Sequence, residues 1–253
     1  MTDRTLTTAR LGDLECVIAN APPPRAPSPR RIVVLLHGFG APGDDLVGLA
    51  DAFAAPDTTM VFPAAPLTFA EIYGAPPFMD ARAWWRLDLE AIERARRTGG
   101  LRDLTRERPE GLDAARGRVT RLLGELRAKH PDASFVLGGF SQGAMLATDT
   151  ALREDVPLDG LVVLSGSLLC EPEWRPLFPT LARLKVFQSH GADDDILPYA
   201  YAARLHEGLR EAGVDARFVR FEGGHGIAPE VLGALAAFLD GLPRAASPVD
   251  EIR

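Results

Sequence analysis

The sequence predicts a single α/β domain with a mostly parallel central sheet, helices on both faces and an N-terminal antiparallel hairpin. Short apolar runs alternate with longer stretches of helical periodicity, a pattern typical of a parallel sheet covered by helices. The length of 253 residues suits one such domain. Neither an internal repeat nor a change of composition marks a boundary. We therefore expect residues 1–253 to form one domain that ends in a loose tail over about residues 245–253.

The hairpin is expected at the edge of the sheet. Thr5–Leu11 and Leu14–Ala19 flank the pair Gly12-Asp13, which suits a tight turn between two antiparallel strands. The proline-rich stretch that follows, residues 21–30, is interpreted as a stiff exposed connector rather than as a polyproline ligand for another protein.

The remaining elements follow in alternation. The strands are expected in the short apolar runs Ile32–Leu36, Thr58–Phe62, Phe135–Phe140, Leu161–Ser165, Val186–Ser189 and Ala216–Phe221. The helices are expected where apolar residues recur every three or four positions, at Leu87–Arg97, Gly111–His130, Ala144–Arg153, Tyr199–Ala212 and Pro229–Leu239. The long stretch between Pro63 and Trp85 is irregular and rich in proline and aromatic residues, which is typical of a functional loop.

Composition and charge argue against several classes of partner. A formal charge of −7 and a pI near 5.3 give no attraction to phosphate backbones, so we expect no nucleic-acid partner. The longest apolar runs are far shorter than the roughly 18 residues of a membrane span. The N-terminus lacks the charged-then-apolar order of a secretory signal. Cys16 and Cys170 cannot build a disulfide framework and are expected to be buried thiols, which favours a cytoplasmic location.

The strongest chemical signal is the G-x-S-x-G pattern GFSQG at residues 139–143. It follows an apolar strand and precedes a helical run, which is the strand-turn-helix setting of a nucleophile elbow. A serine at so sharp a turn has a strained backbone, and side chains two residues before and after it would collide, so both positions need glycine. Ser141 is therefore the candidate nucleophile, and the alternative is a tight turn with an ordinary capping serine.

A serine hydroxyl needs a base, and the chain has five histidines. Two of them, His190 and His225, lie in loops after predicted strands. His225 is preferred because its glycine neighbours let the ring approach another loop closely, and because the order nucleophile, acid, base along the chain is one that triad enzymes follow. An exposed loop histidine is the alternative for His225.

The acid is expected between the nucleophile and the base, in the loop after the strand Val186–Ser189. Three adjacent carboxylates compete there, Asp193, Asp194 and Asp195, and spacing does not choose among them. A carboxylate beside the imidazole Nδ1–H fixes the tautomer and stabilises the imidazolium. The alternatives are a solvated acidic turn, or a metal site that uses His190 with these carboxylates but lacks a second histidine at a useful spacing.

Three separated blocks carry a resemblance to a known family. They are LHGFG at residues 36–40 with Gly43-Asp44, GFSQG at 139–143, and H-G-x-x-D-x-x-L-P at 190–198 with the later Gly224-His225. In these blocks the chain resembles the phospholipase/carboxylesterase family of α/β-hydrolases, which includes bacterial carboxylesterases and acyl-protein thioesterases. The resemblance spans most of the chain and implies the α/β-hydrolase fold.

The resemblance also assigns roles. It implies Ser141 as nucleophile, Asp194 as the triad acid and His225 as general base, with the backbone N–H groups of Phe39 and Gln142 as the oxyanion hole. Such a triad forms and hydrolyses an acyl-enzyme without a metal or organic cofactor, so none is expected.

The expected function is that of a carboxylesterase acting on small to medium acyl esters, with lysophospholipase or thioesterase action as variants of the same chemistry. A serine peptidase or amidase is one alternative, because a triad does not itself select esters over amides. A catalytically silent binding protein of the same fold is the other. The expected partner is a small-molecule ester, and the chain is expected to be a monomer or a homodimer.

One region departs from small members of the family. The segment from about Ala81 to Pro109 looks longer than in acyl-protein thioesterases, and about residues 63–109 are expected to form a flap over an acyl pocket. The pocket walls are expected from the aromatic residues Phe69, Tyr73, Phe78, Trp84 and Trp85. The alternative is that these rings pack the core. If Trp84 lines the pocket, its replacement by alanine changes the preferred acyl length.

Overall fold

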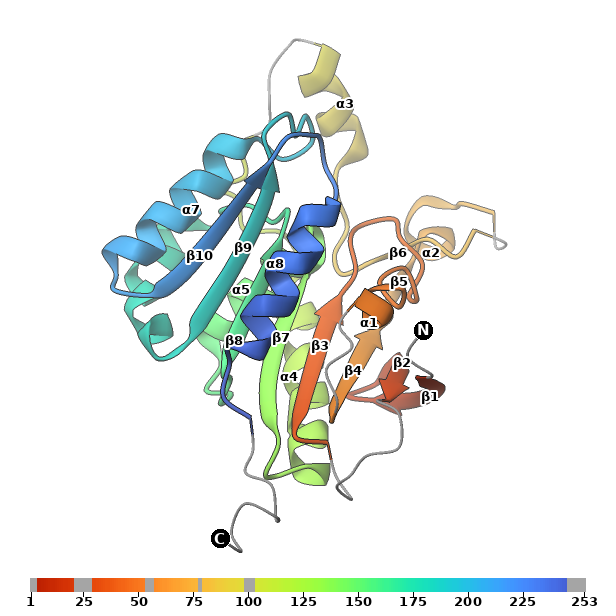
Figure 1. Cartoon of the computed structure of the whole chain (residues 1–253). Helices are drawn as coiled ribbons and strands as arrows, with labels where there is room; N and C mark the ends of the chain where they lie inside the picture. The colour runs from red at the N-terminus through yellow and green to blue at the C-terminus, as the bar shows by residue number, and fades with distance from the viewer. Residues whose placement is uncertain (1–3, 21–28, 53–56, 77–78, 98–102, 245–253) are drawn as a thin grey trace, which may run out of the picture.

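The structure is a computed structural model, and it describes residues 4–20, 29–52, 57–76, 79–97 and 103–244 (Figure 1). Within them, eight strands form one sheet in the order β1-β2-β4-β3-β7-β8-β9-β10. Their bounds are β1 (Thr5–Leu11), β2 (Leu14–Asn20), β3 (Arg31–Leu36), β4 (Thr58–Pro63), β7 (Ser134–Phe140), β8 (Gly160–Leu164), β9 (Lys185–Gly191) and β10 (Asp215–Phe221). The strands from β4 to β10 pair in parallel, whereas β1 and β2 are antiparallel to their neighbours, which confirms the predicted fold class.

The turn of the N-terminal hairpin has the backbone that its sequence predicts. Gly12 and Asp13 both have positive φ angles, 56° and 66°, which suit a two-residue hairpin turn. Glycine is also required at the first of these positions for space, because a Cβ on Gly12 would lie 2.3 Å from the backbone nitrogen of Leu122. The predicted hairpin is therefore confirmed, and its turn packs against a helix behind the sheet.

Helices cover both faces of the sheet (Figure 1). Their bounds are α1 (Leu49–Ala52), α2 (Phe69–Tyr73), α3 (Leu89–Arg97), α4 (Leu112–Lys129), α5 (Gln142–Arg153), α6 (Glu171–Trp174), the 3₁₀ helix η1 (Arg175–Arg183), α7 (Tyr199–Glu211) and α8 (Pro229–Asp240). Helices α4, α5 and α7 pack on one face, and α1 and α8 on the other. The predicted long helices are present with ends shifted by one or two residues, while α1, α2 and α6 are too short to show a helical period in the sequence.

The carboxyl ends of the parallel strands meet at one edge of the sheet, the upper edge in Figure 1. The central strand β3 is buried along its whole length, as a strand covered on both faces must be. The segment with the short strands β5 (Leu67–Thr68) and β6 (Arg82–Ala83), together with helix α3, lies above this edge (Figure 1). Ligands of open α/β sheets bind outside the carboxyl ends of the strands, so we expect a functional site at this edge.

A fully buried arginine joins the opposite edge of the sheet to the last helix. The Arg31 side chain at the start of β3 donates hydrogen bonds to the carbonyl oxygens of Leu239, Leu242 and Pro243. These carbonyl groups lie at the carboxyl end of α8 and just after it, where unpaired acceptors and the helix dipole favour a positive charge. Burial lowers the pKa of Arg31 to about 10.

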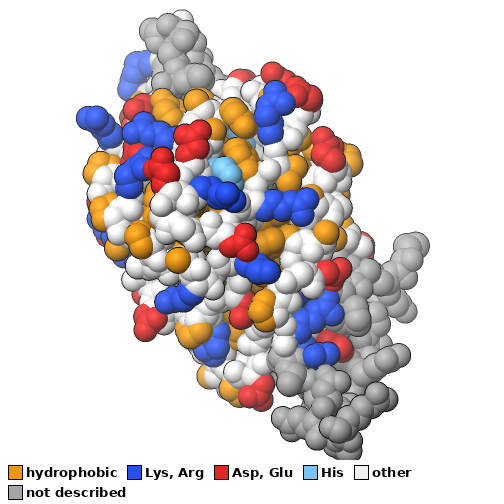
Figure 2. Space-filling view, turned by 60° about the vertical axis from the view of Figure 1, so that its left-hand side comes forward, with side chains coloured by type: hydrophobic (Ala, Val, Ile, Leu, Met, Phe, Trp, Pro, Cys, Tyr) orange, Lys and Arg blue, Asp and Glu red, His pale blue; other side chains and the backbone are white. Residues whose placement is uncertain are grey.

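The surface and the thiols agree with the sequence in two respects. On the face shown in Figure 2, acidic and basic side chains of the described residues are interspersed rather than gathered into a basic patch. Cys16 and Cys170 are buried, as predicted, and burial raises the pKa of each thiol to about 12.

No helix in the described part of the chain is long and apolar enough to cross a membrane.

Candidate active site

A strained serine stands at the end of β7. Ser141 has φ 54° and ψ −117°, a combination that ordinary residues avoid, and it precedes the first turn of α5. Its backbone N–H donates to the carbonyl oxygen of Leu164 at 2.9 Å, which ties the turn to the neighbouring strand β8. The side chain is therefore presented at the amino end of a twelve-residue helix.

The two glycines of the G-x-S-x-G pattern are required by close backbone packing. A Cβ on Gly139 would lie 2.5 Å from the carbonyl oxygen of Leu36, and a Cβ on Gly143 would lie 2.1 Å from the same atom. Real Cβ atoms do not approach backbone that closely. The turn around Ser141 therefore folds against the end of β3 only with glycine at both positions, which is the steric reason that the sequence pattern predicts.

The structure brings Ser141, His225 and Asp194 into one hydrogen-bonded chain. Ser141 Oγ lies 2.8 Å from His225 Nε2, and His225 Nδ1 lies 2.7 Å from Asp194 Oδ2. Asp194 is buried, whereas its neighbours Asp193 and Asp195 are exposed. Only one of the three competing carboxylates is therefore in contact with the imidazole, and it is the one that the resemblance indicates.

Glycines let the loop of His225 approach the loop of Asp194. A Cβ on Gly191, at the end of β9, would lie 2.3 Å from the carbonyl oxygen of Gly224. Across this contact, Asp193 N–H donates to the carbonyl oxygen of Gly223 at 2.9 Å. On the other side, Phe140 packs its ring 4.9 Å from that of His225. The imidazole thus lies between Asp194, in the loop after β9, and Phe140, at the end of β7.

The Asp194 carboxylate is saturated with donors. Oδ1 accepts from the backbone N–H groups of Ile196 at 3.0 Å and Leu197 at 2.8 Å, and Oδ2 accepts from His225 and, at 3.1 Å, from His190. Burial alone would raise the pKa of Asp194, but the hydrogen bonds from His190, His225 and Leu197 outweigh it and hold the pKa well below its usual range. The carboxyl group is therefore ionised next to His225.

The loop after β3 abuts the serine. A Cβ on Gly38 would lie 3.4 Å from Ser141 Cβ, and Phe39, Ser141 and Gln142 line the same cavity. Within the described residues, neither the Phe39 nor the Gln142 backbone N–H donates a hydrogen bond to the protein. Both predicted oxyanion-hole residues therefore lie beside Ser141 with a free backbone donor.

The Gln142 side chain has a structural role that the sequence did not indicate. It is buried, its Oε1 accepts from the backbone N–H of Trp84 and its Nε2 donates to the carbonyl oxygen of Trp85, both at 2.9 Å. Trp84 in turn donates its indole N–H to the carbonyl oxygen of His37 at 2.9 Å. These bonds fasten the segment after β6 to both the serine turn and the loop after β3. No sequence pattern marks this pairing, because the partners are backbone atoms.

The His37 side chain holds the loop after β3 from within. Its Nε2 accepts the backbone N–H of Ala65 at 2.9 Å, and its Nδ1 donates to the carbonyl oxygen of Gly38 at 2.8 Å. Burial lowers the pKa of His37, although the Gly38 carbonyl opposes this shift. A neutral ring suits these bonds, since one nitrogen accepts and the other donates.

A cavity of about 490 Å³ opens beside Ser141 and His225. The apolar residues on its walls include Leu87, Leu104, Pro109, Met145, Leu169 and Leu197. Charged side chains of both signs, Arg86, Asp88, Glu107, Arg108, Glu110 and Asp195, also border it. Most of these wall residues could not be predicted from the sequence. Met145 is an exception, because it lies one helical turn after Ser141 and therefore faces the same way.

The structure places the predicted aromatic wall residues in different surroundings. Trp85 lines the cavity, but Trp84, Phe69 and Tyr73 do not. Trp84 is buried, and the His37 carbonyl oxygen supplies the acceptor that its buried indole N–H needs, so its replacement is not expected to act directly on acyl length. Phe69 and Tyr73 instead pack against the Phe39 ring, at 4.9 Å and 6.2 Å between centroids. The fifth aromatic residue, at position 78, lies outside the described residues.

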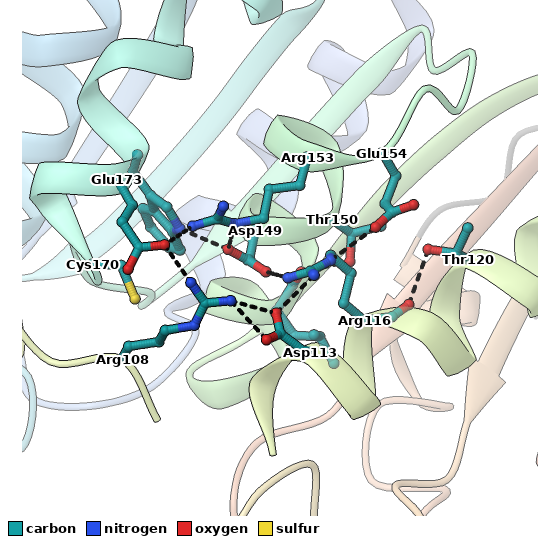
Figure 3. A network of polar contacts seen from close by, with 12 residues as sticks. Arg108, Asp113, Arg116, Thr120, Asp149, Thr150, Arg153, Glu154, Cys170 and Glu173 are labelled. Atoms are coloured by element: carbon teal, nitrogen blue, oxygen red, sulfur yellow. Dashed lines mark hydrogen bonds and ion pairs between the residues drawn. The ribbon is translucent and has the colours of Figure 1, made fainter. Parts of the chain in front are cut away.

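A closed ring of ion pairs holds one wall of the cavity against the helices (Figure 3). The wall carries Leu104 and Arg108. Successive pairs join Arg108, Asp113, Arg116, Asp149, Arg153 and Glu173, and the last returns to Arg108. Asp149 is the buried member, at 0% exposure, and also accepts the indole N–H of Trp174 at 2.8 Å. Arg108, which borders the cavity, is therefore already paired with two carboxylates of the protein, those of Asp113 and Glu173.

Among the described residues, no three His, Cys, Asp or Glu side chains gather as metal ligands would.

Comparison with known proteins gives a consistent picture. A family model described as Phospholipase/Carboxylesterase matches residues 23–242. Acyl-protein thioesterase 1 of Eremothecium gossypii is 30% identical over 230 residues, which cover 85% of this chain and 89% of that protein.

Solved structures share the fold. The crystal structure of esterase PE8 is 30% identical, with a TM-score of 0.72, and the match covers 94% of this chain and 100% of that chain. A carboxylesterase from Mesorhizobium loti is 19% identical, with a TM-score of 0.68 over 94% of this chain and 99% of that one. At that identity the second likeness shows the arrangement of the chain alone.

Proposed function

Because the chain belongs to the phospholipase/carboxylesterase family, whose members hydrolyse esters, we propose that it is a serine carboxylesterase using Ser141, His225 and Asp194 as its triad. The observation that carries the proposal is the hydrogen-bonded chain from the strained serine to the buried carboxylate, at 2.8 Å and 2.7 Å, beside an apolar cavity. Nucleophile, base and orienting acid within hydrogen-bond reach are the geometric requirement of this chemistry.

In the proposed reaction, Ser141 Oγ attacks the acyl carbonyl carbon while His225 Nε2 takes its proton. Asp194 stabilises the imidazolium that forms. The carbonyl oxygen becomes an oxyanion and accepts hydrogen bonds from the N–H groups of Phe39 and Gln142, a contribution of about 3 kcal/mol for each donor. His225 then protonates the leaving alcohol, and an acyl-enzyme remains. Water, deprotonated by His225, releases the acid and restores Ser141.

The cavity supports a proposal for the substrate class. Its apolar wall residues suit an acyl chain, and its volume of about 490 Å³ lies within the range of sites for small organic ligands. We therefore propose small to medium acyl esters as substrates. Thioesters are a second candidate, because the same triad cleaves them and a relative that is 30% identical is named an acyl-protein thioesterase.

A substrate panel tests the proposal. Purified protein is assayed with p-nitrophenyl esters from acetate to dodecanoate, with an acyl thioester of the best chain length and with the matching p-nitroanilide. We expect ester hydrolysis with a maximum at an intermediate length and little turnover of the anilide. Anilide hydrolysis as fast as ester hydrolysis would replace the proposal by an amidase, and no turnover of any substrate by folded protein would contradict it.

Filling the cavity tests where the acyl chain lies. Leu104 is half-buried on the cavity wall, so the variant Leu104→Trp reduces the space available to a long chain. We expect kcat/KM for the longest good ester to fall about tenfold, because a few displaced methylene contacts are worth that much. The value for p-nitrophenyl acetate stays within about twofold. The control is Leu6→Trp on the exposed edge strand β1, and equal profiles for both variants would place the acyl chain elsewhere.

A further inference from the structure

A second histidine contacts the proposed triad carboxylate. His190 is the sixth residue of β9, has 0% exposure and takes no part in the proposed mechanism. Its Nε2 lies 2.7 Å from the carbonyl oxygen of Leu197 and 3.1 Å from Asp194 Oδ2. Asp194 Oδ2 is also the atom that accepts from His225 Nδ1 at 2.7 Å. Two imidazole rings therefore share one carboxylate oxygen.

The contacts of His190 identify which of its nitrogens carries the proton. Both atoms near Nε2 are oxygen acceptors, so Nε2 must be a donor. Nδ1 is buried and has no hydrogen-bond partner within the described residues. The Nε2–H of His190 thus faces the Leu197 carbonyl oxygen at 2.7 Å and, at the longer distance of 3.1 Å, Asp194 Oδ2.

The carboxylate of Asp194 does not need His190 to stay in place. Its other oxygen, Oδ1, accepts two backbone N–H groups of its own loop, those of Ile196 and Leu197. With Oδ1 and the backbone fixed, the position of Oδ2 is fixed as well. The contact from His190 therefore changes the charge on Oδ2 more than its position, since a hydrogen bond to an ionised group withdraws part of its negative charge.

We propose that His190 limits the charge that Asp194 presents to His225, and so keeps His225 neutral, and able to accept the Ser141 proton, at lower pH. The inference rests on the proposed function, because it concerns the base of that reaction. A carboxylate with fewer donors attracts a proton on the adjacent imidazole more strongly. His190 would thus extend the activity toward acid pH without touching the substrate.

Other polar and charged groups face this pair and are constant in the test. Ser141 Oγ contacts His225 Nε2, and the Phe140 ring packs on the same imidazole. The Tyr199 ring, at the start of α7, lies 6.3 Å from that of His190. The exposed carboxylates of Asp193 and Asp195 flank Asp194 in the chain.

The test removes the donor and restores it. The variants His190→Leu and His190→Asn lose a donor within reach of Asp194 Oδ2, whereas His190→Gln keeps an amide N–H near the position of Nε2. For the first two we expect the acid limb of the kcat/KM profile to move to higher pH by about half a unit to one unit. The alkaline plateau stays within about threefold of the wild-type value. The limb of His190→Gln returns most of the way to wild type.

A second readout needs no turnover. NMR titration of isotope-labelled histidine rings follows the protonation of His225 directly, and its midpoint is expected to rise by a similar amount, about half a unit to one unit, in His190→Leu. A wild-type protein without esterase activity would defeat the proposed function, yet this titration would still report whether His190 acts on His225. If one of the variants His190→Leu and His190→Asn fails to fold, the other carries the measurement.

A neighbouring variant separates charge sharing from general damage to the strand. Gln188 lies two residues before His190 on β9, is buried and donates to the carbonyl oxygen of Ala202, away from Asp194. Gln188→Leu removes a buried donor from the same strand and is expected to leave the acid limb in place. The proposal fails if the limb of His190→Leu does not move, if it moves to lower pH, or if Gln188→Leu shifts it equally.

Discussion

Replacing Ser141 by alanine is expected to lower kcat/KM for p-nitrophenyl esters by about 10⁵-fold or more, with the fold unchanged. The hydroxyl that bonds His225 at 2.8 Å is the atom proposed to attack the acyl carbon, and alanine leaves no nucleophile at this turn. Because Ser141 is almost completely buried and its strained backbone is held by Leu164, loss of one oxygen atom should not release the turn. Initial rates under matched protein concentrations measure the effect.

The matched control is Ser134→Ala. Ser134 begins the same strand β7, at the opposite end from the site, and makes a weak 3.4 Å contact with Arg31. We expect its kcat/KM to stay within about twofold of wild type, as for a substitution outside the reacting groups. A Ser141→Ala variant that retains a tenth or more of the activity would mean that another residue is the nucleophile.

Replacing Asp149 by asparagine is expected to lower the free energy of unfolding by about 3 kcal/mol or more. Asp149 is fully buried and accepts from Arg116 at 2.6 Å, from Arg153 at 2.8 Å and from the Trp174 indole at 2.8 Å (Figure 3). Asparagine removes the negative charge between two guanidinium groups and directs its own N–H₂ donors at one of them. Loss of one partner from a buried ion pair is costly because the other charge stays desolvated.

Glu154 provides the control for this effect, since it pairs with Arg116 at 2.8 Å from the partly exposed end of the same helix. Glu154→Gln is expected to cost about 1 kcal/mol or less, because water solvates both groups when the pair is lost. Urea denaturation, with a common slope for the three proteins, measures both values. Equal losses in the two variants would show that the ring of ion pairs depends on total charge rather than on its buried member.

The strands and long helices could be predicted from the sequence because each has a local signal. Apolar runs such as that of β3 and the buried stripe of α4, which includes Leu112, Val119 and Leu126, are visible as periodicity. Helix α5 begins two residues earlier than predicted, at Gln142, because Ser141 itself precedes the first turn. The sequence does not predict the 3₁₀ helix η1, since it contains Pro179, and a proline inside a segment argues against a helix there.

In the candidate site, too, features that depend on a short stretch of sequence could be predicted, and features that depend on contacts between distant residues could not. The serine turn can be recognised from the sequence because its pattern spans five consecutive residues, although the atom that excludes a Cβ at both glycines, the carbonyl oxygen of Leu36, belongs to another strand. The choice among three adjacent aspartates depends on which carboxylate faces His225 from another loop, and spacing carries no information about that direction. The sequence does not separate wall residues from core residues for the same reason: Trp84 is apolar enough for a cavity, but its indole N–H donates to the His37 carbonyl oxygen across the fold.

The most direct test of the central claim is labelling with a fluorophosphonate, which phosphonylates an activated serine, followed by location of the adduct by peptide mass. The account predicts a single adduct on Ser141 and a loss of esterase activity in step with the labelled fraction. Esterase activity that persists after Ser141 is fully labelled, or an adduct on a different serine that abolishes it, would contradict the account.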